Sequence, residues 1–215
     1  DLVKKSIFVL ISIMLIGSII FYAYSNYING HIVGMMQDED SSLQFNEAMY
    51  YPVYNAEHID EGDFLGYLTN GRNRIEVFDS NEKLYQVTDE EPMDYLLYTL
   101  HAEMELIRVL HVANHVKTIP ITFFDQLPYE SIDDIAYHGQ SFHQYLAVEE
   151  NITQQLRILD EDATLVYYAF ESVPSHQWLV VYNKEANTYH AFFTEFDQLD
   201  AVPAAIYVYH QPDTL

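Results

Sequence analysis

The 215-residue chain has no cysteine, only seven glycines, and only nine lysine or arginine residues against 33 acidic ones. Without cysteine it has no disulfide framework, no thiolate metal site and no cysteine nucleophile. It also lacks a P-loop, a dinucleotide fingerprint and a Gly-x-Ser-x-Gly elbow, so the sequence argues against nucleotide enzymes. The net charge of −24 leaves no basic face for nucleic acid, and we therefore expect no nucleic-acid partner.

Apolar residues, by contrast, are plentiful. Hydrophobic residues make up 49% of the chain, which includes 19 tyrosines and 12 phenylalanines. This content is far above that of a disordered acidic tail, because the aromatic and branched side chains offer enough surface to offset chain entropy. A packed, folded domain is therefore expected.

One long apolar segment lies near the N-terminus. The 18 residues from Ile7 to Tyr24 carry no charge, and about 20 helical residues cross a bilayer core of about 30 Å. Lys4 and Lys5 precede the segment, and tyrosines cluster at its far end, where an aromatic belt would sit. We interpret residues 1–30 as a cytoplasmic stub followed by a transmembrane signal-anchor helix. The localisation predicted is the cell membrane, with a single pass and the bulk of the chain extracytoplasmic.

Two other interpretations of this segment remain open. Ala23-Tyr24-Ser25 has the small-x-small pattern of a signal-peptidase site, so the helix could be a cleaved signal peptide. It could also be the buried core helix of a soluble protein, although such a helix is rarely apolar on every side. If the helix is a membrane anchor or a cleaved signal peptide, the bulk of the chain is exported.

The charge is divided between the two parts of the chain. Residues 1–30 carry a net charge of +1 and the remaining 185 residues carry −25. Within the acidic part we expect a membrane-proximal stalk over residues 31–63, which contain two acidic runs, and an extracytoplasmic domain over residues 64–215. Such an acidic surface repels anionic ligands and attracts cations.

The patterns beyond residue 63 predict an α+β fold, in which helices pack on an antiparallel sheet behind the N-terminal transmembrane helix. Helix signals begin at Thr88-Asp89-Glu90-Glu91-Pro92 and predict a helix to about Val116, and a second, interrupted helical region is expected over Tyr129–Leu159. An extended edge segment is expected over 118–124. Alternating or aromatic-rich stretches predict strands at 74–79, 83–87, 164–170, 177–182, 188–193 and 205–209.

The stretch from Arg74 to Glu90, RIEVFDSNEKLYQVTDE, has two alternating runs around a polar turn. It resembles the strand-turn-strand of PAS-like or Cache-like sensor ectodomains. The resemblance covers about 17 residues, and it implies a domain that senses a signal outside the cell.

A group of histidines offers the most suggestive chemistry. On the expected helix, His101, Glu105, His111 and His115 would lie on one side, with His111 and His115 one turn apart. Two imidazoles at this spacing can share a divalent metal ion, and Glu105 could add an oxygen ligand. However, the motif lacks the adjacent glutamate of zinc peptidases, and His111 falls in the apolar stripe, where a hydrogen-bonded core histidine is the usual explanation. Apart from this metal no cofactor is predicted.

Two further residue classes are abundant without being specific. Paired carboxylates, such as those of residues 38–40 and 160–162, are typical of solvated loops and at most of a loose calcium site. The aromatic residues of the C-terminal strands could line a ligand pocket or a partner surface, or they could form the core face of a sheet. They are Tyr167, Tyr168, Trp178, Tyr182, Tyr189, Tyr207 and Tyr209.

The sequence as a whole favours a membrane-anchored extracytoplasmic binding domain over an enzyme. The domain would be either a signal-sensing ectodomain, with a small-molecule ligand, or an accessory subunit of a membrane or envelope assembly, with a protein partner. The assembly version gains from Gly17 and Ser18, a small-residue patch suited to helix packing. The alternative function is an envelope metal-dependent hydrolase that uses the histidine-rich helix.

Overall fold

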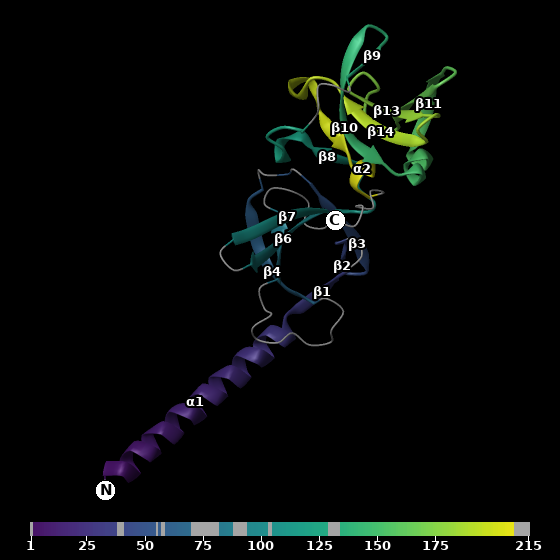
Figure 1. The fold of residues 1–215 in the computed structure, drawn as a ribbon. Helices are drawn as coiled ribbons and strands as arrows, with labels where there is room; N and C mark the ends of the chain where they lie inside the picture. The colour runs from purple at the N-terminus through teal and green to yellow at the C-terminus, as the bar shows by residue number, and fades with distance from the viewer. Residues whose placement is uncertain are drawn as a thin grey trace.

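A computed structural model describes residues 2–37, 41–54, 56, 59–69, 82–87, 94–102, 105–128 and 134–208. It begins with the helix α1 (Leu2–Gly30), which projects as a rod from the rest of the molecule (Figure 1). From Ile7 onward its described large apolar side chains are 46% to 67% exposed, apart from Ile28, which is buried. The expected N-terminal apolar helix is thus confirmed, and it is long and apolar enough to be a membrane anchor or a signal sequence.

A closed barrel of seven strands follows the helix directly. Its order around the barrel is β1-β2-β3-β7-β6-β5-β4, and β1 closes it by pairing parallel to β4. Leu43, Leu84 and Leu96 are fully buried inside it. The strands are β1 (Ile32–Met36), β2 (Leu43–Phe45), β3 (Ala48–Val53), β4 (Glu61–Thr69), β5 (Glu82–Val87), β6 (Tyr95–Ala102) and β7 (Glu105–Ala113).

Two-residue turns join the strands of two hairpins, one in the barrel and one in the C-terminal unit. Asn46 and Glu47 both have positive φ, and they form the two-residue turn between β2 and β3. His138 and Gly139 repeat this arrangement in the C-terminal unit, between β9 and β10. Positive φ at both central residues is the geometry of the type I′ turn, whose twist matches that of the flanking strands.

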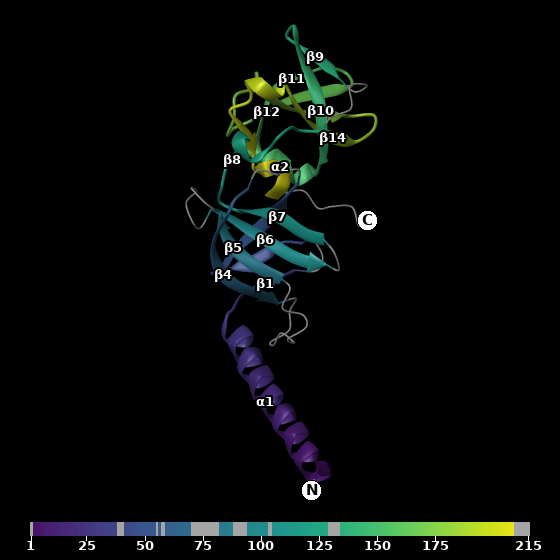
Figure 2. The same cartoon turned by 90° about the vertical axis from the view of Figure 1, so that its left-hand side faces the viewer.

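The C-terminal unit is a curled antiparallel sheet at the far end of the molecule from α1 (Figures 1 and 2). Its strand order is β11-β12-β13-β14-β10-β9. The strands are β9 (Ile135–Tyr137), β10 (Gln140–Val148), β11 (Leu156–Glu161), β12 (Leu165–Phe170), β13 (Trp178–Asn183) and β14 (Thr188–Phe193). A two-stranded ribbon of β8 (Thr118–Pro120) and β15 (Ala201–Pro203) accompanies it, with the short helix α2 (Ala205–Val208) and the 3₁₀ helices η2 (Ile121–Phe123), η4 (Glu150–Gln155) and η5 (Phe196–Gln198).

The barrel and the C-terminal unit share one hydrophobic core. Leu97 and Leu110, on the outer face of β6 and β7, belong to the same buried cluster as Trp178 and Phe193 of the C-terminal sheet. Polar contacts reinforce it: the hydroxyls of Tyr145 and Tyr207 lie 2.6 Å apart, the Tyr95 hydroxyl donates to Thr118 O at 2.8 Å, and Trp178 Nε1 donates to Ala201 O at 2.9 Å. A shared core of this kind holds the two units in a fixed relation.

The α+β expectation is corrected by this architecture, because the molecule is mostly β-sheet and no long helix packs on its described sheets. The helix expected to begin within 88–92 and run to about Val116 is wrong: the described part of this segment forms the hairpin of β6 and β7. The helical region expected over Tyr129–Leu159 is also wrong, since β9, β10, η4 and part of β11 occupy it. Residues 205–208, expected as a strand, form α2.

Other expectations fare better. The strands expected at 164–170, 177–182 and 188–193 are confirmed as β12, β13 and β14, and they pair antiparallel in sequence order. The extended edge segment at 118–124 is confirmed only at its start, where β8 lies, because η2 follows at once. The expected strand at 83–87 is confirmed as β5.

The expected strand at 74–79 lies outside the described residues, and so does most of the stretch that resembles a PAS-like or Cache-like domain. In the described part, β5 pairs with β4 and β6 of the barrel. The segment 31–63, for which we expected a stalk, holds β1, β2, β3 and the start of β4, so its described strands are barrel strands. The division of the chain at residue 63 otherwise stays a prediction.

Candidate functional site: a pocket between the two β units

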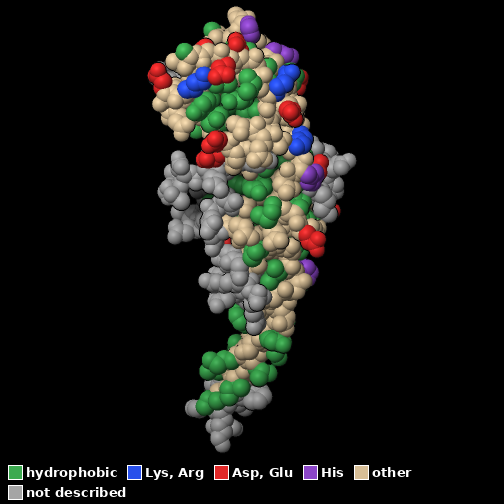
Figure 3. Space-filling model, turned by 90° about the vertical axis from the view of Figure 1, so that its right-hand side faces the viewer, with side chains coloured by type: hydrophobic (Ala, Val, Ile, Leu, Met, Phe, Trp, Pro, Cys, Tyr) green, Lys and Arg blue, Asp and Glu red, His purple; other side chains and the backbone are tan. Residues whose placement is uncertain are grey.

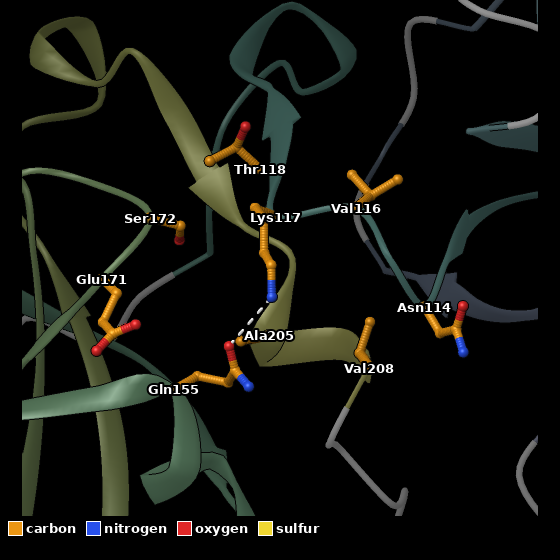
Figure 4. Close-up of a pocket in the computed structure, with 9 residues that line it drawn as sticks. All are labelled: Asn114, Val116, Lys117, Thr118, Gln155, Glu171, Ser172, Ala205 and Val208. Atoms are coloured by element: carbon orange, nitrogen blue, oxygen red, sulfur yellow. Dashed lines mark hydrogen bonds between the residues drawn. The ribbon is translucent and has the colours of Figure 1, made fainter.

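A pocket of about 360 Å³ opens where the end of the barrel meets the C-terminal unit. Its walls come from five segments: the residues after β7, the start of β8, the end of η4, the residues after β12, and α2. Figure 4 shows the side chains that line it. They are Asn114, Val116, Lys117, Thr118, Gln155, Glu171, Ser172, Ala205 and Val208.

Lys117 is the cation of this pocket, and its backbone is held on both sides. Its carbonyl oxygen accepts a hydrogen bond of 3.0 Å from Ala204 N, and the next residue, Thr118, pairs with Pro203 in the two-stranded ribbon. The ammonium donates to Gln155 Oε1 at 3.3 Å, the dashed line in Figure 4. The fold thus directs a positive charge into the pocket from a fixed backbone.

Two other basic side chains of the described residues form ion pairs. Arg108 pairs with Glu61, and Lys184 pairs with Glu161, each at 2.7 Å. Within the described ranges Lys117 forms no such pair, although Glu171 lines the same pocket. Its contact is the neutral amide of Gln155, which leaves the charge free to meet a ligand.

His111 lies in the barrel wall with its imidazole enclosed. Its Nε2 is 3.1 Å from Ser41 O, its Nδ1 is 3.2 Å from Val109 O, and its ring meets the edge of Tyr98. Burial lowers the pKa of His111, and the two carbonyl contacts only partly offset that effect. A neutral imidazole has one N–H, so it donates to one of these carbonyls and not to both.

His115 lies in the turn after β7, where it faces solvent. Its Nε2 is 2.9 Å from Asp94 Oδ1, and its side chain is 61% exposed. The one-turn spacing that would bring His111 and His115 together does not exist here, because a strand and a turn replace the helix. The side chains of His101 and Glu105 lie outside the described part of the structure.

No group of three His, Asp or Glu residues within the described ranges is arranged to hold a metal ion. The metal site of His101, Glu105, His111 and His115, and the hydrolase that depends on it, stay predictions. Their original support, a shared helix face, is removed by the β6–β7 hairpin.

The acidic turn at 160–162 has a structural explanation. Asp162 Oδ1 accepts backbone hydrogen bonds from Thr164 at 2.7 Å and Leu165 at 2.8 Å, and the Lys184 ammonium donates to the Asp162 carbonyl at 2.6 Å. These backbone bonds lower the pKa of Asp162. The carboxylate therefore shapes the turn that leads into β12.

The described aromatic residues of the C-terminal strands pack into the shared core or against one another. Trp178 and Tyr207 are buried in the shared core. Tyr182 and Tyr189 stack at 4.3 Å on a half-buried part of the sheet, and Tyr167 stacks on Tyr137 at 4.7 Å. Tyr209 lies outside the described residues. The aromatic residues thus serve mainly to pack the sheet on itself and on the barrel.

Sequence reasoning missed the pocket residues. Lys117, Gln155 and Glu171 are far apart in the chain and belong to no motif, so only the folding of β8, η4 and β12 around α2 brings them together. It also missed His143, whose Nδ1 is 2.9 Å from Asp134 Oδ1 and whose Nε2 is 3.6 Å from Glu195 Oε1.

Comparison with known proteins adds no family to this picture: no family model, curated protein or solved structure matches the chain. The site itself therefore carries any inference about function.

Proposed function

We propose that the chain is a single-pass, membrane-anchored extracytoplasmic binding protein, whose two β units recognise a ligand in the pocket between them. The observation that carries this proposal is α1, which exposes apolar side chains along its length while the β units behind it are packed (Figure 3). A lone apolar helix of this length is stable when lipid covers it, since its backbone hydrogen bonds are satisfied internally.

The junction between α1 and the barrel supports a retained anchor. Ile28 is fully buried against Tyr67 of β4, and Tyr67 N donates to His31 O at 2.9 Å. The possible cleavage site at Ala23-Tyr24-Ser25 lies within the continuous helix, and Ser25 is 6% exposed. Proteases act most readily on exposed, irregular backbone, so the helical conformation of this site favours a retained anchor, although Tyr24 itself is 46% exposed.

Charge supports the orientation. Lys4 and Lys5 lie before the span, and the rest of the chain carries −25. Because positive residues flanking a span remain on the cytoplasmic side, the β units belong outside the cell.

The pocket favours the sensing version of this role over the assembly version. A concave site with convergent polar groups is the usual form of a small-molecule site, and its volume of about 360 Å³ is in the range for such sites. A protein partner would need a broad contact surface instead.

The anchor is tested by fractionation of cells that express the full chain. We expect the protein to sediment with membranes, to resist alkaline extraction, and to have an intact mass that includes residues 1–30. Recovery of a soluble product that lacks residues up to about Ser25 would show a cleaved signal sequence and contradict the proposal.

A further inference from the structure

We propose that the pocket binds a small zwitterion of the amino-acid type with an aliphatic side chain. This inference rests on the proposed binding role and names its ligand class. In this arrangement the ligand carboxylate meets Lys117, its ammonium meets Glu171, and its side chain contacts the apolar wall near α2.

The first support is the pairing of opposite charges in one pocket. Lys117 and Glu171 both line it and both are exposed, yet no ion pair joins these two described side chains. Figure 4 shows the Lys117 ammonium directed toward Gln155, with Glu171 on one side and Val208 on the other. Two opposite charges that do not neutralise each other leave room for a ligand that carries both signs.

The second support is the charge of the whole molecule. The chain beyond residue 30 carries −25, so its field disfavours the approach of any ligand with net negative charge. A simple carboxylate would gain from Lys117 but would be repelled at a distance. A zwitterion has no net charge, so it can use Lys117 without that cost.

The third support is the composition of the remaining wall. Val116, Ala205 and Val208 provide apolar surface, while Asn114 and Ser172 add neutral polar groups. The volume of about 360 Å³ is near the lower end of ligand pockets, which range over about 300–1,000 Å³. A free aliphatic amino acid or a dipeptide fits this combination.

The walls are also held in place before any ligand arrives. Ala204 N donates to Lys117 O, and Glu171 N donates to Gln155 O at 3.3 Å, so each charged residue has its own backbone hydrogen bond. Tyr207 of α2 is buried, and its hydroxyl contacts the Tyr145 hydroxyl. A preformed pocket binds more tightly because less ordering is needed on binding.

The test is isothermal titration calorimetry of the full chain in detergent. The probes are L-leucine and L-alanyl-L-leucine, titrated to ~10 mM, above the constant of about 1 mM that corresponds to about 4 kcal/mol of binding. Saturable binding of either probe is expected. Isocaproate, which lacks the ammonium, and isoamylamine, which lacks the carboxylate, should each bind about tenfold more weakly than L-leucine, equivalent to ~1.4 kcal/mol.

Variants locate the binding. Lys117→Gln and Glu171→Gln should each weaken binding of the zwitterionic probe about tenfold, equivalent to ~1.4 kcal/mol. The matched controls Lys184→Gln and Glu185→Gln change charges in the turn after β13, away from the pocket, and should leave binding unchanged.

Three results would overturn the inference: no saturable binding of either probe, binding of isocaproate or isoamylamine as tight as that of L-leucine, or binding that persists unchanged in Lys117→Gln and Glu171→Gln. Membrane retention is measured separately. A chain that stays in the membrane but does not bind the probes therefore overturns this inference alone, whereas a soluble chain overturns the proposed function.

Discussion

At His111 the barrel encloses a titratable side chain that has carbonyl oxygens at both ring nitrogens. Burial is the largest effect on it and lowers its pKa. A lowered pKa in the folded state means that the unfolded chain takes up a proton first as the pH falls. His111 therefore costs stability below its unfolded pKa of about 6.5 and costs nothing above it.

The resulting prediction concerns the pH dependence of unfolding. Between about pH 7.5 and 5.5 the wild-type chain should lose stability more steeply than His111→Gln, by up to ~1.4 kcal/mol per pH unit below about 6.5. Thermal unfolding in detergent over this range measures the difference. The control His176→Gln, which removes an exposed histidine, should keep the wild-type slope. Parallel curves for wild type and His111→Gln would show that His111 titrates alike in both states.

Gly66 lies where the chain of β4 packs closely against His31 and Val33. A Cβ at this position would be 2.5 Å from His31 O and 2.5 Å from Val33 Cγ1, at the point where β1 and β4 close the barrel. Backbone and a β-branched side chain can move little here, so Gly66 permits the close contact between the end of α1 and β4.

Substitution at this position tests the junction. Gly66→Ala should lower the free energy of unfolding by about 1–3 kcal/mol, the usual cost of overpacking. Gly30→Ala, whose Cβ would meet nothing within 4 Å, is the matched control and should be neutral or slightly stabilising. Denaturant unfolding of both variants in detergent gives the comparison, and equal stability of the two would mean that the barrel closure is looser than described.

At the scale of elements, β12, β13 and β14 of the C-terminal sheet and β5 of the barrel could be predicted, whereas the segments that form β6, β7, β9 and β10 were expected to be helical. The strands β13 and β14 are separated by a polar turn, 184–187, that marks a hairpin in the sequence. In β6, Tyr95, Leu96 and Leu97 are all buried, because Leu96 faces the barrel interior while its neighbours face the shared core. A strand covered on both faces loses the alternation of apolar and polar residues, and its leucines then fit a helical stripe equally well.

The other misread elements have similar reasons. The two-residue turns at Asn46-Glu47 and His138-Gly139 are short, and only one of these residues is glycine, so the hairpins around them were easy to miss. The segment that forms α2 contains Ile206, Tyr207 and Val208, residue types that favour strands, but tertiary contacts decide its conformation. No sequence motif predicted the pocket, because its charged residues come to line one cavity only after both sheets have formed.

The β6–β7 hairpin can be tested against the helix that the sequence suggested. The chain has no cysteine, so pairs of introduced cysteines give an unambiguous result. Leu100 and Ile107 are cross-strand partners, with Cα atoms about 4.5–5.5 Å apart in such a pair, whereas seven helical residues span about 10.5 Å. Leu100→Cys with Ile107→Cys should therefore form a disulfide on oxidation.

The matched control reverses the geometry. Leu96→Cys with Leu100→Cys places the sulfurs on one helix face about 5–6 Å apart, but about 13 Å apart along a strand. Gel mobility or intact mass after oxidation shows which pair cross-links. Cross-linking of the control pair without cross-linking of the first pair would support the helix and contradict the barrel.

For the molecule as a whole, α1 and the β units have opposite characters. The helix presents apolar side chains, while acidic side chains are spread over the two units beyond it (Figure 3). The helix runs into β1 within two residues, and Ile28 is buried against the barrel. The base of the barrel is therefore held at a fixed short distance from the end of α1. The helix α2, which lines the pocket, lies beyond the barrel from α1 (Figures 1 and 2).

The most direct measurement of this account is the side of the membrane on which each end of the helix lies. Two single-cysteine variants, Ser6→Cys before the span and Ala186→Cys in the exposed turn between β13 and β14, are treated with a membrane-impermeant maleimide. In intact cells we expect labelling at Ala186→Cys and none at Ser6→Cys, with both labelled after lysis. Labelling of Ser6→Cys in intact cells, or of Ala186→Cys only after lysis, would contradict the membrane-anchored, outward-facing arrangement.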